Sequence, residues 1–273
     1  MVIVNDKLLT INPEQIMIPF TDRQAQFEEQ KPELLEAMHR VAASGVYLMG
    51  PELESFEHEF GSYIDAPHVI GVHSGTDALE LSLRSIGISY NDEVMMPVNA
   101  YPTAFGVAAS GCRIRFCDVD PDTLTLSVDT VSRALTKLTR AIIAVHLYGM
   151  PAPIPELLEF AAPFNIAVIE DCAQAVGARI NSQHVGTMGH IGCFSFYPTK
   201  NLGAMGEGGA VVTSDPDIAD KIRKLRMYGE DVRYHSLMKA SHSRLDELQA
   251  AILRARLRFL EHDLKRRRER AQR

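Results

Sequence analysis

The sequence predicts an α/β fold with a mainly parallel sheet between two layers of helices. Short apolar, β-branched runs alternate with longer segments of helical periodicity, which is the pattern of strand–helix–strand units. Several runs, such as 141–145 and 166–169, are apolar without alternation, as in strands covered on both faces. The 273 residues are enough for one large domain of this kind.

The predicted strands are short runs rich in β-branched and apolar residues. In chain order they are 69–73, 93–96, 113–117, 141–146, 166–170, 192–197 and 209–213. The predicted helices are segments with apolar residues three or four positions apart. They are 31–43, 52–62, 76–87, 102–110, 129–138, 154–163, 216–228 and 244–270. Ligands of such sheets bind beyond the carboxyl ends of the strands, so we expect the chemistry just after each strand.

Composition and motif content argue against several functional classes. Lys plus Arg number 28 against 35 for Asp plus Glu, and a net charge of −7 disfavours a nucleic-acid partner. No apolar run is long enough to cross a bilayer and the first residues do not resemble a signal peptide, so we expect a cytoplasmic protein without a membrane partner. No GxGxxG follows the first strand and no GxxxxGK[ST] occurs, which disfavours nicotinamide enzymes and P-loop NTPases.

Cysteines and histidines do not form a metal-binding pattern. The four cysteines lack CxxC spacing and are predicted to be reduced, partly buried thiols. An HExxH match begins at His58, but Ser62 occupies the place of the second histidine. We therefore expect no metal site.

The first predicted strand ends in HSGTDALELSL, where a turn opens a helix. Exposed amide hydrogens and the helix dipole make such a turn an anion site. Gly75 allows a close approach to the backbone, and the Thr76 hydroxyl could add a donor. The alternative is that Thr76 only caps the helix.

Two adjacent acids, Glu170 and Asp171, end the buried strand at 166–170. Buried acids are costly unless they have a partner. Asp171 could hold a protonated ring nitrogen, or it could be an ordinary capping or salt-bridged acid.

The segment FSFYPTKNLGAMGEGG, residues 194–209, carries a lysine in a turn rich in Pro and Gly. A partly desolvated Lys200 would have a lowered pKa and could be the nucleophile of a Schiff base. Ser195 lies five residues earlier, on the preceding strand. Alternatively, Lys200 is a surface lysine. Tyr101 follows another strand end, and it either stacks on a ligand ring or belongs to the core.

Together these segments provide what pyridoxal phosphate requires. Gly75, Thr76 and Ser195 form a phosphate cup, Asp171 is an acid for the pyridine nitrogen, and Lys200 supplies the amine. The acid keeps the ring protonated, so that the ring can take up the electrons of a carbanion.

Five motifs spread over nearly the whole chain carry a resemblance to a known family. They are SGTDAL (74–79), VHLYG (145–149), EDCAQAVGA (170–178), GHIGCFSFYPTKNLGAMGEGGAVVT (189–213) and SRLDELQAAIL (243–253). On these motifs the chain resembles the sugar aminotransferases of the DegT/DnrJ/EryC1/StrS group. The resemblance implies a three-layer α/β sandwich with a mainly parallel mixed sheet, the aspartate-aminotransferase-like large domain of fold type I.

The resemblance also implies individual roles. Lys200 would form the internal aldimine and then move the proton between cofactor and sugar carbons, while Asp171 would pair with the pyridinium nitrogen. The remaining roles concern cofactor binding: Gly75, Thr76 and Ser195 at the phosphate, Gln174 near the phenolic oxygen, and Tyr101 stacked on the ring.

In this family a segment like 240–246 crosses into the neighbouring subunit's site, so a homodimer with a shared active site is expected. His242 occupies the position of the Asn that usually touches the phosphate, and Arg244 is retained as a substrate-binding residue. The expected domains are a large domain of residues 1–243, which includes an N-terminal arm over 1–45. A long helix over 244–273 would lead towards a small C-terminal domain that this chain lacks.

The predicted function is transfer of an amino group from glutamate or glutamine to a keto-sugar, in particular a nucleotide-linked one, or to a keto-cyclitol. The form EDCAQ with YPTKNLGA resembles members that act on 3-keto sugars or keto-cyclitols. Sugar dehydratases of the same group carry a histidine in place of the lysine, so Lys200 argues against dehydration. The alternative is a shortened chain that keeps the fold without transaminase activity and acts as a partner subunit or regulator.

Overall fold

The computed structural model describes residues 2–4, 7–9 and 21–272, which form two compact units, Met1–Lys31 and Pro32–Arg273. In the first unit β1 (Val2–Val4) pairs antiparallel with β2 (Lys7–Leu9). The helix α1 (Arg23–Ser44) begins in this unit and ends in the second. The predicted arm over 1–45 therefore falls partly on residues outside the described ranges.

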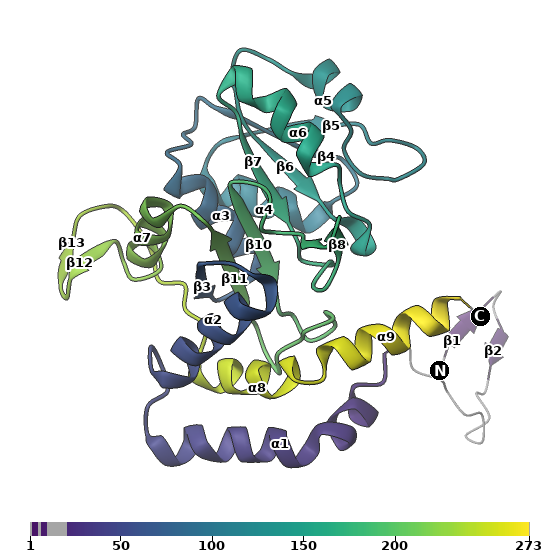
Figure 1. Ribbon diagram of the computed structural model, residues 1–273, viewed down its shortest axis with the longest axis vertical. Helices are drawn as coiled ribbons and strands as arrows, with labels where there is room; N and C mark the ends of the chain where they lie inside the picture. The colour runs from purple at the N-terminus through teal and green to yellow at the C-terminus, as the bar shows by residue number, and fades with distance from the viewer. Residues whose placement is uncertain (1, 5–6, 10–20, 273) are drawn as a thin grey trace. The chain divides into compact units, whose positions relative to one another are not determined.

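Within the described residues, the second unit contains a seven-stranded sheet of order β3-β11-β10-β7-β6-β4-β5 (Figure 1). The strands are β3 (His68–Val72), β4 (Glu93–Pro97), β5 (Arg113–Cys117), β6 (Thr139–Val145), β7 (Ala167–Asp171), β10 (Ile191–Ser195) and β11 (Gly209–Thr213). Of these seven described strands, β11 runs in the opposite direction to the other six. Each of the seven strands predicted from the sequence is present, and the mainly parallel mixed sheet is confirmed.

Helices cover both faces of this sheet. Residues that alternate along a strand are therefore buried against opposite helical layers. Ile143 on β6 packs in the core beneath one helical layer, whereas Ile142 and Ala144 pack in the core beneath the other. The first layer contains α3 (Gly75–Ser85), α4 (Tyr101–Ser110) and α7 (Pro216–Leu225). The second contains α2 (Pro51–Ile64) and α8 (Glu247–Leu257) towards β3, and α5 (Val128–Ala134) and α6 (Ile154–Ala161) towards β4 (Figure 1). The three-layer architecture is confirmed.

The prediction of a single long helix over 244–270 is wrong. The segment forms α8 and α9 (Leu260–Ala271), with a turn at Arg258 and Phe259. In this turn the Phe259 amide donates to the carbonyl of Arg256 three residues back, at 3.0 Å. The change lets Leu260 and Leu264 join the same apolar cluster as the buried face of α8. No Gly or Pro marks the break in the sequence, so only the packing reveals it.

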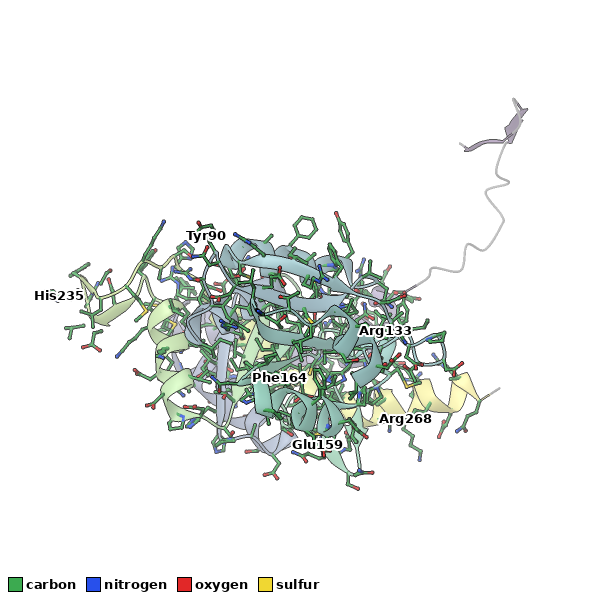
Figure 2. The ribbon with its side chains drawn as sticks, turned by 90° about the horizontal axis from the view of Figure 1, so that it is seen from above. Tyr90, Arg133, Glu159, Phe164, His235 and Arg268 are labelled. Atoms are coloured by element: carbon green, nitrogen blue, oxygen red, sulfur yellow. The ribbon has the colours of Figure 1, made fainter. Side chains whose placement is uncertain are left out.

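A small hairpin, β12 (Glu230–Val232) with β13 (His235–Ser236), projects from the side of the sheet unit. Figure 2 shows His235 at its far end, away from the body of the unit. None of the helices in the described part of the chain combines the length and apolar character needed to cross a membrane.

The four cysteines are unpaired, as predicted, and three of them are buried. Burial raises the pKa of the Cys117 thiol to about 11. It raises the pKa of Cys172 as well, with Glu170 adding to the effect. These thiols are therefore protonated core side chains rather than nucleophiles.

Candidate active site

One cavity of about 440 Å³ lies at the carboxyl ends of β6 and β7, where the topology of the sheet predicts a ligand site. Seven residues singled out from the sequence line it: Gly75, Thr76, Tyr101, Asp171, Gln174, Ser195 and Lys200. They come from four separate segments of the chain, at 75–76, 101, 171–174 and 195–200. The fold therefore brings together the proposed phosphate cup, acid and amine.

Asp171 ends β7 and is 5% exposed. One carboxylate oxygen, Oδ1, accepts a hydrogen bond from the Ala173 amide at 3.0 Å. The other, Oδ2, accepts one from the Thr103 hydroxyl at 2.7 Å. Both donors are neutral, so among the described residues the carboxylate has no cationic hydrogen-bond partner, and lone pairs remain to accept a bond from a ligand.

Glu170, next to Asp171, is fully buried and its carboxylate is saturated with donors. Oε1 accepts from the amides of Met188 and Gly189 at 2.9 and 2.7 Å. Oε2 accepts from the amide of Gly186 at 2.7 Å and faces the His146 Nε2 at 3.0 Å. The adjacent acids thus have different partners, and Glu170 fastens the 186–189 loop to the strand that carries Asp171.

His146 is the buried counterpart of Glu170, and its hydrogen bonds define its tautomer. Its Nδ1 accepts from the Ala152 amide at 3.0 Å, so the ring proton is on Nε2 and is donated to Glu170. Among the described residues, His146, Glu170 and Cys172 come close enough together to suggest a metal site. Because the imidazole and the carboxylate already have partners, this cluster is a hydrogen-bonded network.

The Lys200 amine is half-buried in the wall of the cavity. Burial lowers the pKa of Lys200, and the nearby Asp171 carboxylate opposes this shift. A lowered pKa increases the fraction of neutral amine at a given pH, which is the form that attacks a carbonyl carbon. The interpretation of Lys200 as an ordinary surface lysine is therefore disfavoured.

The chain just after Lys200 is held by α8. The Met205 amide donates to the Gln249 Oε1 at 2.9 Å. The buried Arg256 donates from Nη1 to the carbonyl oxygens of Gly203 and Ala204. A helix from far along the chain thus fixes the loop that follows the lysine.

The proposed phosphate cup lies at the start of α3. Ser74, and not Thr76, caps this helix, because its hydroxyl accepts from the Asp77 amide at 3.1 Å. The interpretation of Thr76 as the cap is therefore wrong. A Cβ at Gly75 would lie 2.7 Å from the Ser195 Cβ, so only glycine lets these two walls of the cup approach so closely.

Replacing Gly75 by alanine should weaken binding of a phosphate-bearing ligand. The new methyl group would push Ser195 and the first turn of α3 apart, and overpacking of this kind costs enough to lower affinity about tenfold or more. The measurement is the dissociation constant of pyridoxal phosphate beside that of pyridoxal, which lacks the phosphate. Equal weakening for both ligands would contradict a phosphate-specific role.

The remaining cavity residues present a polar amide and two exposed rings. The Gln174 Oε1 accepts from the Tyr148 amide at 2.8 Å, which leaves the Gln174 NH₂ free to donate into the cavity. Tyr148 adopts a left-handed backbone conformation, φ 53°, and is 84% exposed. Tyr101 is 76% exposed and packs edge-on against Phe105, so it is not the core residue that the sequence left as an alternative.

His242 and Arg244 do not line this cavity. His242 is exposed, with its ring 5.5 Å from that of Tyr228, and Arg244 lies 5.9 Å over the same tyrosine. Arg244 lines a separate cavity of about 850 Å³ beside the β12–β13 hairpin. The intervening Ser243 donates to Asp77 on α3, which ties the segment to the rim of the cup.

Sequence reasoning missed the residues that support the site: Thr103, Gln249, Arg256 and the partners of Glu170, which include His146. The cost of burying adjacent acids did signal that a partner was needed. Because β6 and β7 are parallel neighbours, a histidine just after β6 was the candidate to test. Thr103 has no comparable signal, since a threonine in the first turn of a helix usually serves that helix.

Pyridoxal phosphate fits the residues present. The cup at Gly75 offers the amide end of α3 to an anion such as a phosphate, Asp171 lines the same cavity, and Lys200 is partly desolvated in its wall. Fold and site together define a pyridoxal-phosphate-binding protein with the large-domain architecture of fold type I. Residues 28–273 match the model of the DegT/DnrJ/EryC1/StrS aminotransferase family, and the chain belongs to that family.

Two curated relatives show how the similarity is distributed. The chain is 46% identical over 245 residues to the dTDP-3-amino-3,4,6-trideoxy-alpha-D-glucose transaminase of Streptomyces venezuelae. It is 43% identical over 239 residues to the UDP-N-acetyl-3-dehydro-alpha-D-glucosamine 3-aminotransferase of Acidithiobacillus ferrooxidans. These alignments cover 89% and 87% of this chain but 65% of each relative, so the chain spans about two thirds of their length.

Solved structures agree with this assignment. The crystal structure of S. venezuelae DesV in complex with a ketimine intermediate matches with a TM-score of 0.87 and 46% identity, over 90% of this chain and 66% of that one. The structure of Bacillus subtilis NtdA with bound cofactor PMP matches with a TM-score of 0.84 and 31% identity, over 91% and 57%.

Proposed function

We propose that this chain carries the cofactor site of an aminotransferase that moves an amino group from glutamate or glutamine to a keto-sugar linked to a nucleotide. The observation that carries the proposal is the joint position of Lys200 and Asp171 in the wall of one cavity, next to the cup at Gly75. When bound, pyridoxal phosphate would supply an electron sink for the carbanion formed when the amino donor loses its α-proton.

The protein's own groups have separate tasks in this reaction. Lys200, whose pKa is lowered by burial, takes a proton from the carbon of the donor and returns one to the carbon of the sugar. Asp171 would hold the protonated ring nitrogen in place and keep it charged. Thr76 and Ser195 would bind the phosphate, and the NH₂ of Gln174 would donate to the phenolic oxygen of the ring.

We propose carbon 3 of the sugar as the position that receives the amino group. The names of the two curated relatives described above support this, since they describe a 3-amino sugar and a 3-dehydro sugar. The exposed Tyr148 at the cavity rim gives a flat apolar surface that suits a sugar ring.

We also propose a homodimer in which the segment 240–246 completes the neighbour's site. His242 and Arg244 support it because they lie outside the cavity of their own chain. If the sites are shared, mixing the inactive variants Lys200→Ala and Arg244→Ala should restore activity, because each hybrid dimer regains one intact site. An equal mixture of exchanged subunits should reach about a quarter of wild-type activity, and no recovery would contradict sharing.

The cofactor site and the reaction can be tested separately. Purified chain loaded with pyridoxal phosphate should absorb visible light, and borohydride should fix the cofactor on Lys200, as peptide mapping would show. Labelling of another lysine ends the proposed site. Labelling of Lys200 without amino transfer from glutamate or glutamine to a nucleotide-linked 3-keto sugar would retain the cofactor site and exclude the reaction for this chain.

A further inference from the structure

A buried hydroxyl contact at Asp171 has no part in the function described so far. The Thr103 Oγ1 donates to the Asp171 Oδ2 at 2.7 Å, and Thr103 is only 2% exposed. A helical threonine commonly donates to a carbonyl three or four residues earlier. In this chain the hydroxyl instead donates to the carboxylate of another element.

Together with a backbone amide, this contact fixes the orientation of the Asp171 carboxylate. Oδ1 is held by the Ala173 amide, and among the described residues Oδ2 is held by Thr103 alone. Two donors on different oxygens fix the rotation of the carboxylate plane, and with it the direction of the lone pairs left for a ligand.

The position of Thr103 is itself rigid. It lies in the first turn of α4, which begins at Tyr101 with Pro102 at its second position. Further along the helix, Gly106 packs so closely on α3 that a Cβ would lie 2.7 Å from the Leu79 Cβ. The first turn of α4 therefore places the exposed Tyr101 at the cavity. The same turn holds the buried Thr103, whose hydroxyl donates to Asp171.

We propose that Thr103 is a positioning residue, which orients the Asp171 carboxylate towards the ring nitrogen of the cofactor. The inference rests on the proposed cofactor site and assigns a new member to it. The role assigned to the hydroxyl is exerted through its hydrogen bond to Asp171. It links the position of α4, which carries the stacking Tyr101, to the ionic contact between Asp171 and the ring nitrogen.

The test uses Thr103→Val, which keeps the shape of the side chain and removes the donor, and Thr103→Ser, which keeps the donor. In Thr103→Val we expect pyridoxal phosphate to bind about tenfold more weakly, because Asp171 loses one of its two anchors. The pH midpoint of the visible absorbance of the bound cofactor should also shift. Thr103→Ser should restore both values towards wild type.

The control is Thr125→Val, which removes another buried hydroxyl, one that contacts Leu126 and Thr123 outside the cavity. It should leave cofactor affinity and the pH midpoint unchanged. Wild-type affinity and an unshifted midpoint in Thr103→Val would overturn the inference and leave the cofactor site intact. A wild-type chain that binds no pyridoxal phosphate would overturn the proposed function and this inference together.

Discussion

Replacing Lys200 by alanine is expected to abolish the covalent attachment of pyridoxal phosphate and to reduce amino transfer by at least about a hundredfold. The lysine supplies both the attacking amine and the group that moves the proton, and no second lysine of the described residues lines its cavity. The measurements are the visible spectrum of the loaded chain and the rate of a single half-reaction with glutamate.

The matched control for this variant is Lys221→Ala, which removes an exposed lysine from α7. It should leave both the spectrum and the rate at wild-type values. Retention of the wild-type spectrum and of borohydride labelling in Lys200→Ala would show that another amine binds the cofactor.

Replacing Glu170 by glutamine is expected to lower the free energy of unfolding more than any other substitution proposed for this chain. The amide NH₂ must face either the amides of Met188 and Gly189 or the amide of Gly186 and the ring of His146. Either orientation opposes donor to donor at two contacts, each of which costs about 1–3 kcal/mol in a buried site. A change of tautomer at His146 would only transfer the conflict to the Ala152 amide.

Chemical denaturation of the cofactor-free chain measures this loss directly. Glu36→Gln is the control, since it changes the exposed pair Glu36–Arg40, and such a pair contributes about 0.3–0.5 kcal/mol. Equal free energies of unfolding for the two variants would contradict the hydrogen-bond network at Glu170.

The strands were predictable because a parallel sheet buried on both faces requires continuous apolar runs. The runs at 141–145 and 166–169 meet this requirement and are too short for a buried helix of ordinary length. The end of α8 was not predictable from the local sequence. LRARLRFLEHDL keeps an apolar spacing compatible with one straight helix, and the turn at Arg258 follows from how Leu260 and Leu264 meet the core.

The cavity residues were predictable because chemistry at a strand end leaves small, recognisable signals: a glycine before a helix, an acid after a buried run, a lysine in a turn. The residues that hold these cavity residues in place were not predictable. Thr103, Gln249 and Arg256 act through hydrogen bonds to distant elements, and no local spacing reports a bond between residues 103 and 171.

The hydrogen bonds from Gln249 and Arg256 of α8 to the loop after Lys200 have a consequence for biosynthesis. Arg256 follows Gly203, whose carbonyl it binds, by 53 residues. At ordinary rates of translation the ribosome needs about 3–10 s to add that interval. The strands can pair during this delay, but the turn that bears the reactive amine must wait for α8 to emerge before it can settle. Nascent chains arrested in this interval should therefore be cut by protease after Lys200, whereas the released 273-residue chain should resist cleavage there.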